Sequence, residues 1–236
     1  MSDVDDTPNR LVAAAERLFA EGGEEATSLR AVTRAAISNA AAVHYHFGGR
    51  DGLLRAVLDR HLAGRQQRRL RLLDKATDQY GDQVPVEAVV TAVVRPDLDL
   101  LAKLRKNRVN VARFLGRAAA LRSPVVADYL DRQFAELAER AVPLLTATTG
   151  ADAAATRQRL RLVLDAVSML YARAADPDEP GPLGADDVDE QVRRLVAFGA
   201  AGIAAPAVAE AASDAVPQSA ARRSQAGVGK GKRRKD

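Results

Sequence analysis

The chain has 236 residues, enough for one large domain or two smaller ones with proper cores. It contains no cysteine, which excludes disulfides and thiolate metal sites. Aromatic residues make up only 4% of the chain, and apolar residues recur at three- and four-residue intervals, so we expect an all-α protein. The acidic start has no apolar core, and no run of about eighteen apolar residues occurs, so we expect no signal peptide and a soluble, cytoplasmic protein without a membrane span.

The formal net charge of +4 is concentrated at the C-terminus. Residues 222–236 hold seven basic residues and one acidic residue, and subtracting them from 35 basic and 31 acidic leaves 28 against 30 in residues 1–221. The body is therefore slightly acidic, and any contact with nucleic acid must come from a local patch or from this tail.

The first predicted helix reads "TPNRLVAAAERLFAEGG". Thr7 is expected as its N-cap, Pro8 fits the first helical position, and Gly22 or Gly23 ends it.

Two short helices follow. Thr27 or Ser28 caps "LRAVTRAA", and Asn39 caps "AAAVHYH". The glycines after Phe47 break the chain, and a longer helix begins near Arg50. Short helices joined by a tight turn and flanked by longer ones predict a helix-turn-helix, and residues 26–50 contain three arginines and no carboxylate.

Long helices fill the rest of the chain. We expect an interruption at Pro96, a new helix starting at Ser123 and Pro124, and a kink at Pro143. After Pro206 the composition predicts disorder. The arginine-rich run at residues 65–71 is interpreted as a solvated helix face.

The chain contains, in order, "RLVAAAERLFAEGG", the Thr-Ser cap, the paired short helices, "YHF", a basic residue three positions on and "LL". This combination resembles the DNA-binding head of the TetR (tetracycline repressor-like) family of bacterial transcriptional regulators. The resemblance covers residues 8 to 62, and the remaining helices carry no such motif. It implies that residues 40–46 form a recognition helix for the major groove. The base-contact candidates are Arg30, Ala40, Ala42 and His44, and the phosphate-contact candidates are Thr27, Ser28, Tyr45, His46 and Arg50.

The head departs from the family pattern at Ile37, which stands where the family has glycine in the turn. A β-branched residue disfavours positive φ, so the turn either differs or is strained. The recognition helix begins with Ala40, Ala41 and Ala42, so direct base readout is thin and DNA shape is expected to matter.

The two histidines of "HYH" invite a metal or catalytic reading. Side chains at i and i+2 of a helix point far apart, so His44 and His46 cannot bind one ion together. No partner for a dyad or triad is visible in the sequence. We therefore expect no metal, no cofactor and no enzyme activity.

The later helices predict a pocket and a dimer interface, although caps and ordinary core explain the same residues as well. Apolar walls with a few polar groups suit a ligand, and the effector-pocket candidates are Asn110, Arg113, Phe114, Ser168 and Tyr171. Helices with apolar residues on two sides, or with small residues that permit close approach, suit half of a four-helix interface. The interface candidates are Leu162, Met169, Val192, Leu195, Val196, Gly199 and Ile203.

These interpretations combine into one organisation: residues 1–7 a flexible N-terminus, 8–49 the helix-turn-helix domain, 50–76 a connecting helix, 77–205 an effector-binding and dimerisation domain, and 206–236 a disordered basic tail. The resemblance implies a homodimeric repressor that binds a palindromic operator in double-stranded DNA and is released by a small, mainly apolar effector. An effector-independent or architectural DNA-binding protein remains the alternative, supported by the thin readout and the basic tail. A helical enzyme is the less favoured one.

Overall fold

The computed structural model describes residues 6–107, 109–121, 123–174 and 188–206. Within these ranges the chain forms helices and no strand, which confirms the all-α expectation. The helices are α1 (Thr7–Gly22), α2 (Leu29–Ala35), α3 (Ala40–Phe47), α4 (Arg50–Tyr80), α5 (Val86–Asn107), α6 (Val109–Leu121), α7 (Pro124–Thr149), α8 (Ala153–Ala174) and α9 (Val188–Ala204).

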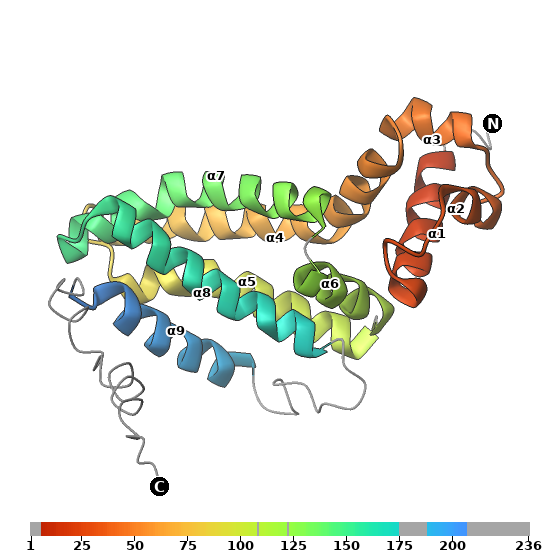
Figure 1. The fold of residues 1–236 in the computed structure, drawn as a ribbon. Coiled ribbons are helices and arrows are strands. Elements are labelled where there is room, and N and C mark those ends of the chain that lie inside the picture. The colour runs from red at the N-terminus through yellow and green to blue at the C-terminus, as the bar shows by residue number, and fades with distance from the viewer. Residues whose placement is uncertain (1–5, 108, 122, 175–187, 207–236) are drawn as a thin grey trace, which may run out of the picture. The chain divides into compact units, whose positions relative to one another are not determined.

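The helix α4 connects two groups of helices (Figure 1). Its first turns pack against α1 and α3, and its later turns pack against α5 and α7. The helices α5, α6, α8 and α9 pack mainly on one another, and α6 also contacts α1. The described residues up to Ala205 form one compact unit, which includes the head formed by α1, α2 and α3.

The short helices of the head are defined by their caps. Ser28 Oγ accepts from the Ala31 amide at 3.1 Å, and Asn39 Oδ1 accepts from the Ala42 amide at 2.9 Å, so both predicted N-caps are confirmed. Gly48 ends α3 in the left-handed conformation, with φ of 70°.

The turn between α2 and α3 is closed by two backbone bonds. The Ser38 amide donates to the Thr33 carbonyl at 2.9 Å, and the Ile37 amide donates to the Arg34 carbonyl at 3.2 Å. This is a Schellman motif, which needs a left-handed residue at its centre. Ile37 supplies it with φ of 50°, so the strained alternative is the one the chain adopts.

Two predicted helix boundaries are wrong. The first helix begins at Thr7 itself and Asp6 precedes it without a side-chain cap bond, so Thr7 is not the N-cap. Pro96 does not interrupt α5, which runs through it to Asn107. The proline lies among buried residues on both sides, and this packing holds the helix together where one amide donor is missing.

The arginine-rich segment of α4 is not a uniformly solvated face. Arg68 and Arg71 are at least partly exposed, but the side chains of Arg65 and Arg69 are only 9% and 4% exposed. The prediction is therefore wrong for these two residues, because both turn inward to a carboxylate on α5.

Candidate DNA-binding head and ligand cavity

The outer face of α3 carries most of the residues predicted to meet DNA. Ala40, His44, Tyr45 and His46 are exposed, while Val43 is completely buried and fixes the helix on the head. The Tyr45 and His46 rings meet edge to face with centroids 4.9 Å apart. Ala42 is half-buried and packs partly against the core, so its methyl group is less available than those of its neighbours.

Polar groups beside α3 extend this surface. Arg30 and Arg34 on α2 are exposed, as is Ser28 at its N-terminus. Amide groups at the first turn of a helix are natural donors to phosphate oxygens. The exposed arginines and the absence of carboxylates between residues 26 and 50 make this surface locally positive.

Thr27 and Arg50, two of the predicted phosphate contacts, are occupied inside the head. Thr27 is 6% exposed, and its hydroxyl donates to the carbonyls of Gly23 at 2.7 Å and Leu18 at 3.1 Å. The Arg50 guanidinium donates to the carbonyls of Thr27 and Glu24 and lies over the Phe19 ring at 5.8 Å. These contacts hold the loop after α1 to the start of α4, so the structure argues against both residues as phosphate ligands.

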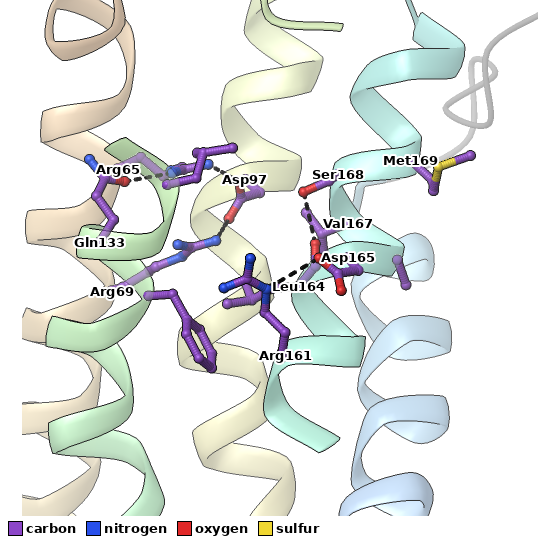
Figure 2. Close-up of a pocket in the computed structure, with 13 residues that line it drawn as sticks. Arg65, Arg69, Asp97, Gln133, Arg161, Leu164, Asp165, Val167, Ser168 and Met169 are labelled. Atoms are coloured by element: carbon purple, nitrogen blue, oxygen red, sulfur yellow. Dashed lines mark hydrogen bonds and ion pairs between the residues drawn. The ribbon is translucent and has the colours of Figure 1, made fainter. Parts of the chain in front are cut away.

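The body contains a cavity of about 370 Å³ between α4, α5, α7 and α8 (Figure 2). Its lining combines apolar and charged side chains. It consists of Arg65, Arg69, Asp97, Leu130, Gln133, Phe134, Arg161, Leu164, Asp165, Ala166, Val167, Ser168 and Met169. This volume lies at the lower end of the range typical of small-molecule sites.

One wall of the cavity is a buried ion cluster. Asp97, 1% exposed, accepts from Arg65 Nη1 at 2.7 Å and from Arg69 Nη2. Tyr171 Oη donates to the backbone carbonyl and to Oδ1 of the same aspartate at 3.1 and 3.2 Å. Arg65 Nη2 donates to Gln133 Oε1 at 2.8 Å, and Arg69 Nε donates to the Val93 carbonyl at 2.9 Å.

The charges in this cluster shift one another's pKa. Burial acts to raise the pKa of Asp97, but the adjacent guanidiniums of Arg65 and Arg69 outweigh it and hold that pKa below its ordinary value. Burial lowers the pKa of Arg69, and the like charge of Arg65 adds to this effect. Burial and the nearby Asp97 carboxylate raise the pKa of Tyr171, which stays a neutral hydrogen-bond donor.

The comparisons with known proteins agree with this architecture. Residues 11–57 match the family model for bacterial regulatory proteins of the tetR family, and residues 91–202 match the model for the tetracyclin repressor-like C-terminal domain. The chain belongs to the TetR family of bacterial transcriptional regulators. It is therefore a DNA-binding regulator and not an enzyme. The sequence matches no curated protein.

Solved structures of bacterial regulators share the fold at low sequence identity. A TetR-like transcriptional regulator from Rhodococcus sp. RHA1 is 20% identical with a TM-score of 0.54, and the match covers 85% of this chain and 97% of that one. A TetR-family regulator from Streptomyces coelicolor A3 is 20% identical with a TM-score of 0.53, covering 87% and 98%. The fatty acid degradation regulator FadR from Bacillus halodurans is 14% identical with a TM-score of 0.52, covering 83% and 95%.

The predicted pocket residues of this TetR-family chain are dispersed. Ser168 lines the cavity, and Tyr171 lies on the ion cluster behind it. Phe114 does not line this cavity: it is 3% exposed and stacks on Phe19 of α1 with ring centroids 6.0 Å apart. The side chains of Asn110 and Arg113 lie outside the described residues.

Sequence reasoning missed the buried charges of the cavity. Arg65 and Arg69 were interpreted as solvated, and Asp97 was not singled out. The available signal was periodicity: Leu62, Arg69 and Leu73 continue one apolar stripe of α4, so the arginine stands where a core residue belongs.

The predicted dimer residues fall into three groups by exposure: exposed, half-buried and buried. Leu162 and Met169 on α8 are 66% and 58% exposed, and both lie on the same face because they are seven residues apart. Leu195 and Val196 are half-buried. Phe198 on α9, which the sequence did not single out, is 66% exposed.

The interface prediction is wrong for Val192, Gly199 and Ile203. All three are buried within this chain. A Cβ added to Gly199 would lie 3.0 Å from Val90 Cγ1 and 3.2 Å from Val163 Cγ2. The small residues of α9 therefore serve its close packing on α5 and α8, and the outward face is left to larger side chains.

Within the described ranges, no three His, Cys, Asp or Glu side chains gather closely enough to hold a metal ion. No helix in the described part of the chain is long and apolar enough to cross a membrane.

Proposed function

We propose that this TetR-family regulator is a ligand-responsive repressor that binds a palindromic operator as a homodimer in the cytoplasm. The observation that carries the proposal is the position of α4. One end of this continuous helix packs against α3, and its middle supplies two arginines to the cavity. A ligand in the cavity therefore contacts the same helix that supports the DNA-binding surface.

The exposed face of α3 enters the major groove in this proposal. Arg30 donates to a guanine, and Ala40 and His44 meet base edges or methyl groups. Ser28, Tyr45 and His46 contact phosphates, which position the head without reading sequence. Discrimination by so few polar groups relies partly on DNA shape.

A homodimer places two such heads on one operator. The exposed apolar side chains of Leu162, Met169 and Phe198 lie on α8 and α9, two helices that also contact each other. Exposed apolar groups shared by adjacent helices fit an isologous interface. In such a dimer the recognition helices lie about 34 Å apart, in successive major grooves.

Repression ends when a ligand favours a different position of α4. A bound ligand can shift the equilibrium only by the difference in its affinity for the two conformations. On α4, the difference in ligand affinity between the two conformations arises through the buried side chains of Arg65 and Arg69. The other members of the ion cluster belong to α5, α7 and α8.

The first test is DNA binding by the purified chain. With DNA flanking its own gene, Arg30→Ala is expected to weaken selective binding by about 1–3 kcal/mol, since it removes a base contact. Arg71→Ala, an exposed charge on α4 outside the head, serves as the matched control. A fluorescence titration at two salt concentrations measures both the affinity and the electrostatic contribution.

Unselective binding that disappears when residues 222–236 are deleted would contradict the repressor proposal and favour an architectural protein. Selective binding that no ligand releases would favour an effector-independent repressor.

The second test is oligomeric state. Leu162→Arg combined with Phe198→Arg is expected to convert a dimer into a monomer in sedimentation equilibrium, because two charges would be buried in an apolar interface. Leu121→Arg is the matched control, since Leu121 is 70% exposed but lies on α6. An unchanged mass for the double variant would show that α8 and α9 do not form the interface.

A further inference from the structure

The cavity wall carries more positive than negative charge. Two buried guanidiniums, Arg65 and Arg69, share the single carboxylate of Asp97, and Tyr171 adds only a neutral hydroxyl. A buried charge without its own counter-ion is costly, since the protein interior replaces little of the hydration it has lost. The cluster of Arg65, Arg69 and Asp97 therefore has a surplus of one positive charge.

Other charged groups near the cavity do not remove this surplus. Arg161 on the opposite wall is paired with Asp131 at 2.6 Å and with Asp165 at 3.5 Å. These two carboxylates are about half exposed, at 55% and 49%, and are engaged by their own arginine. Glu136 accepts from Gln66 but is also exposed, so solvent screens it.

Two independent observations indicate that the cluster is prepared for an anion. Arg65 Nε is buried and, among the described residues, has no hydrogen-bond partner, although Arg65 lines the cavity. Arg69 is 4% exposed and shares the Asp97 carboxylate with Arg65. The pKa of Arg65 is raised, because Asp97 outweighs its burial, whereas the pKa of Arg69 is lowered by burial and by the like charge of Arg65, so one carboxylate does not compensate both guanidiniums. A negatively charged ligand oxygen would accept a hydrogen bond from Arg65 Nε and would neutralise the surplus positive charge.

The remaining lining defines the rest of the ligand. Leu130, Leu164 and Val167 supply aliphatic surface, and the Phe134 ring lies under the Arg161 guanidinium at 4.8 Å. Figure 2 shows the charged and apolar side chains arranged around one space. A volume of about 370 Å³ limits the ligand to a small molecule.

We infer that the effector is a small carboxylic acid whose carboxylate binds Arg65 and Arg69 and whose apolar body packs against Leu130, Phe134 and Leu164. This inference rests on the proposed function, and it replaces the mainly apolar effector expected from the sequence with an anionic amphiphile. One carboxylate neutralises the one surplus positive charge. A phosphate monoester carries a charge of about −1.5 to −2 and would leave negative charge buried. Charge-assisted bonds to guanidinium nitrogens suit a planar carboxylate.

The test compares ligands that differ only in their head group. Octanoate and phenylbutanoate are titrated into the full-length chain by calorimetry without DNA, beside the corresponding alcohols and amines. Each acid is expected to bind at least about tenfold more tightly than its alcohol, the gain expected from hydrogen bonds to a charged partner. The amines are expected to bind most weakly. Acids that bind no more tightly than their alcohols, or that do not bind in the millimolar range, overturn the inference.

Variants on α4 locate the effect. Arg69→Met removes the surplus charge and leaves Arg65 paired with Asp97, so the preference for acids is expected to disappear. Arg69→Lys retains the charge and should retain a preference. Arg71→Met, an exposed position two residues away, should change nothing. A preference that survives Arg69→Met overturns the assignment of the carboxylate to this cluster.

A second variant tests the same site if Arg69→Met does not fold. Ser168→Phe fills the cavity from α8 and leaves the ion cluster intact, so acid binding should be lost while the helical circular dichroism is unchanged. Acid binding that persists in Ser168→Phe contradicts the site. Selective DNA binding measured without ligand reports separately on the proposed function. A chain that binds acids but no operator contradicts the proposed function and leaves the carboxylate site standing. A chain that binds its operator but no acids contradicts only the carboxylate site.

Discussion

The two ends of α4 face opposite physical requirements. At its start the chain must hold a small recognition helix in place, and it does so with backbone groups: Arg50 donates to two carbonyls, and Gly52 lets the backbone of α4 approach Phe47. In its middle the helix places two charged side chains beside a cavity. The head is therefore specified by close backbone geometry, and the body by the balance of buried charge.

This difference predicts different responses to substitution. A single methyl group can disrupt the head if it lies where two backbones meet. The body depends on Asp97, which is the buried carboxylate among the described residues, because removing one partner of a buried ion pair leaves the other uncompensated.

The largest effect is expected for Asp97→Asn. This variant leaves Arg65 and Arg69 buried without a counter-ion, and it should lower the free energy of unfolding by about 3–5 kcal/mol. Urea denaturation measures the change. Asp99→Asn is the control on the same helix, since its partners Arg68 and Arg95 are 43% and 36% exposed and the loss should be about 1 kcal/mol or less. Equal losses for the two variants would show that the cluster is not special.

The Asp97 carboxylate also makes the stability of the protein depend on pH in the acid range. Because the pKa of Asp97 is lowered in the folded chain, its contribution to stability is complete above the ordinary aspartate pKa and is lost as pH falls through the lower folded value. The difference in unfolding free energy between wild type and Asp97→Asn should therefore be constant near neutral pH and shrink below about pH 4. A difference that grows on acidification would have the wrong sign.

The next largest effect is expected at the other end of α4. A Cβ added to Gly52 would lie 1.6 Å from the Phe47 carbonyl oxygen, and backbone there cannot rotate away as a flexible side chain could. Gly52→Ala should cost about 3 kcal/mol and displace α3, so operator binding should be lost as well.

The matched control for this prediction is Gly64→Ala. It lies on the same helix with nothing within 4 Å of the new methyl group, so it should stabilise α4 by about 0.5–1 kcal/mol. Comparing the two variants by thermal unfolding separates the clash at the junction from helix propensity. A harmless Gly52→Ala would show that α3 and α4 have room to separate.

The head could be predicted from sequence because its determinants are local. The caps at Ser28, Asn39 and Gly48 each act within four residues, so their residue types alone place the ends of α2 and α3. What local reasoning missed there is long-range: the carbonyl partners of Arg50 are 23 and 26 positions away. A prediction based on residue type therefore assigned this arginine to phosphate instead of to the fold.

The body could be predicted only as a set of helices. Whether an arginine on α4 faces water or a carboxylate depends on Asp97, 28 and 32 positions further along the chain. In the same way, Gly199 permits close packing, but the sequence does not say whether the neighbour is Val90 of the same chain or a second copy. Partner choice of this kind is decided by tertiary packing, which periodicity alone does not contain.

The smallest effect is expected at Ile37, where the head departs from its own local rules. This residue is 89% exposed and has φ of 50°, so its side chain contributes little packing while its Cβ strains the left-handed turn. Ile37→Gly should raise the free energy of unfolding by about 0.5–1 kcal/mol, the strain relieved less the added entropy of glycine in the unfolded chain. Ala35→Gly, an exposed helical neighbour, should lower it by a similar amount. If Ile37→Gly is stabilised yet binds its operator less tightly, the strained, exposed isoleucine serves DNA contact. If stability and operator affinity both rise, the strain at Ile37 only lowers the stability of the head. The turn then needs nothing more than a residue that accepts positive φ.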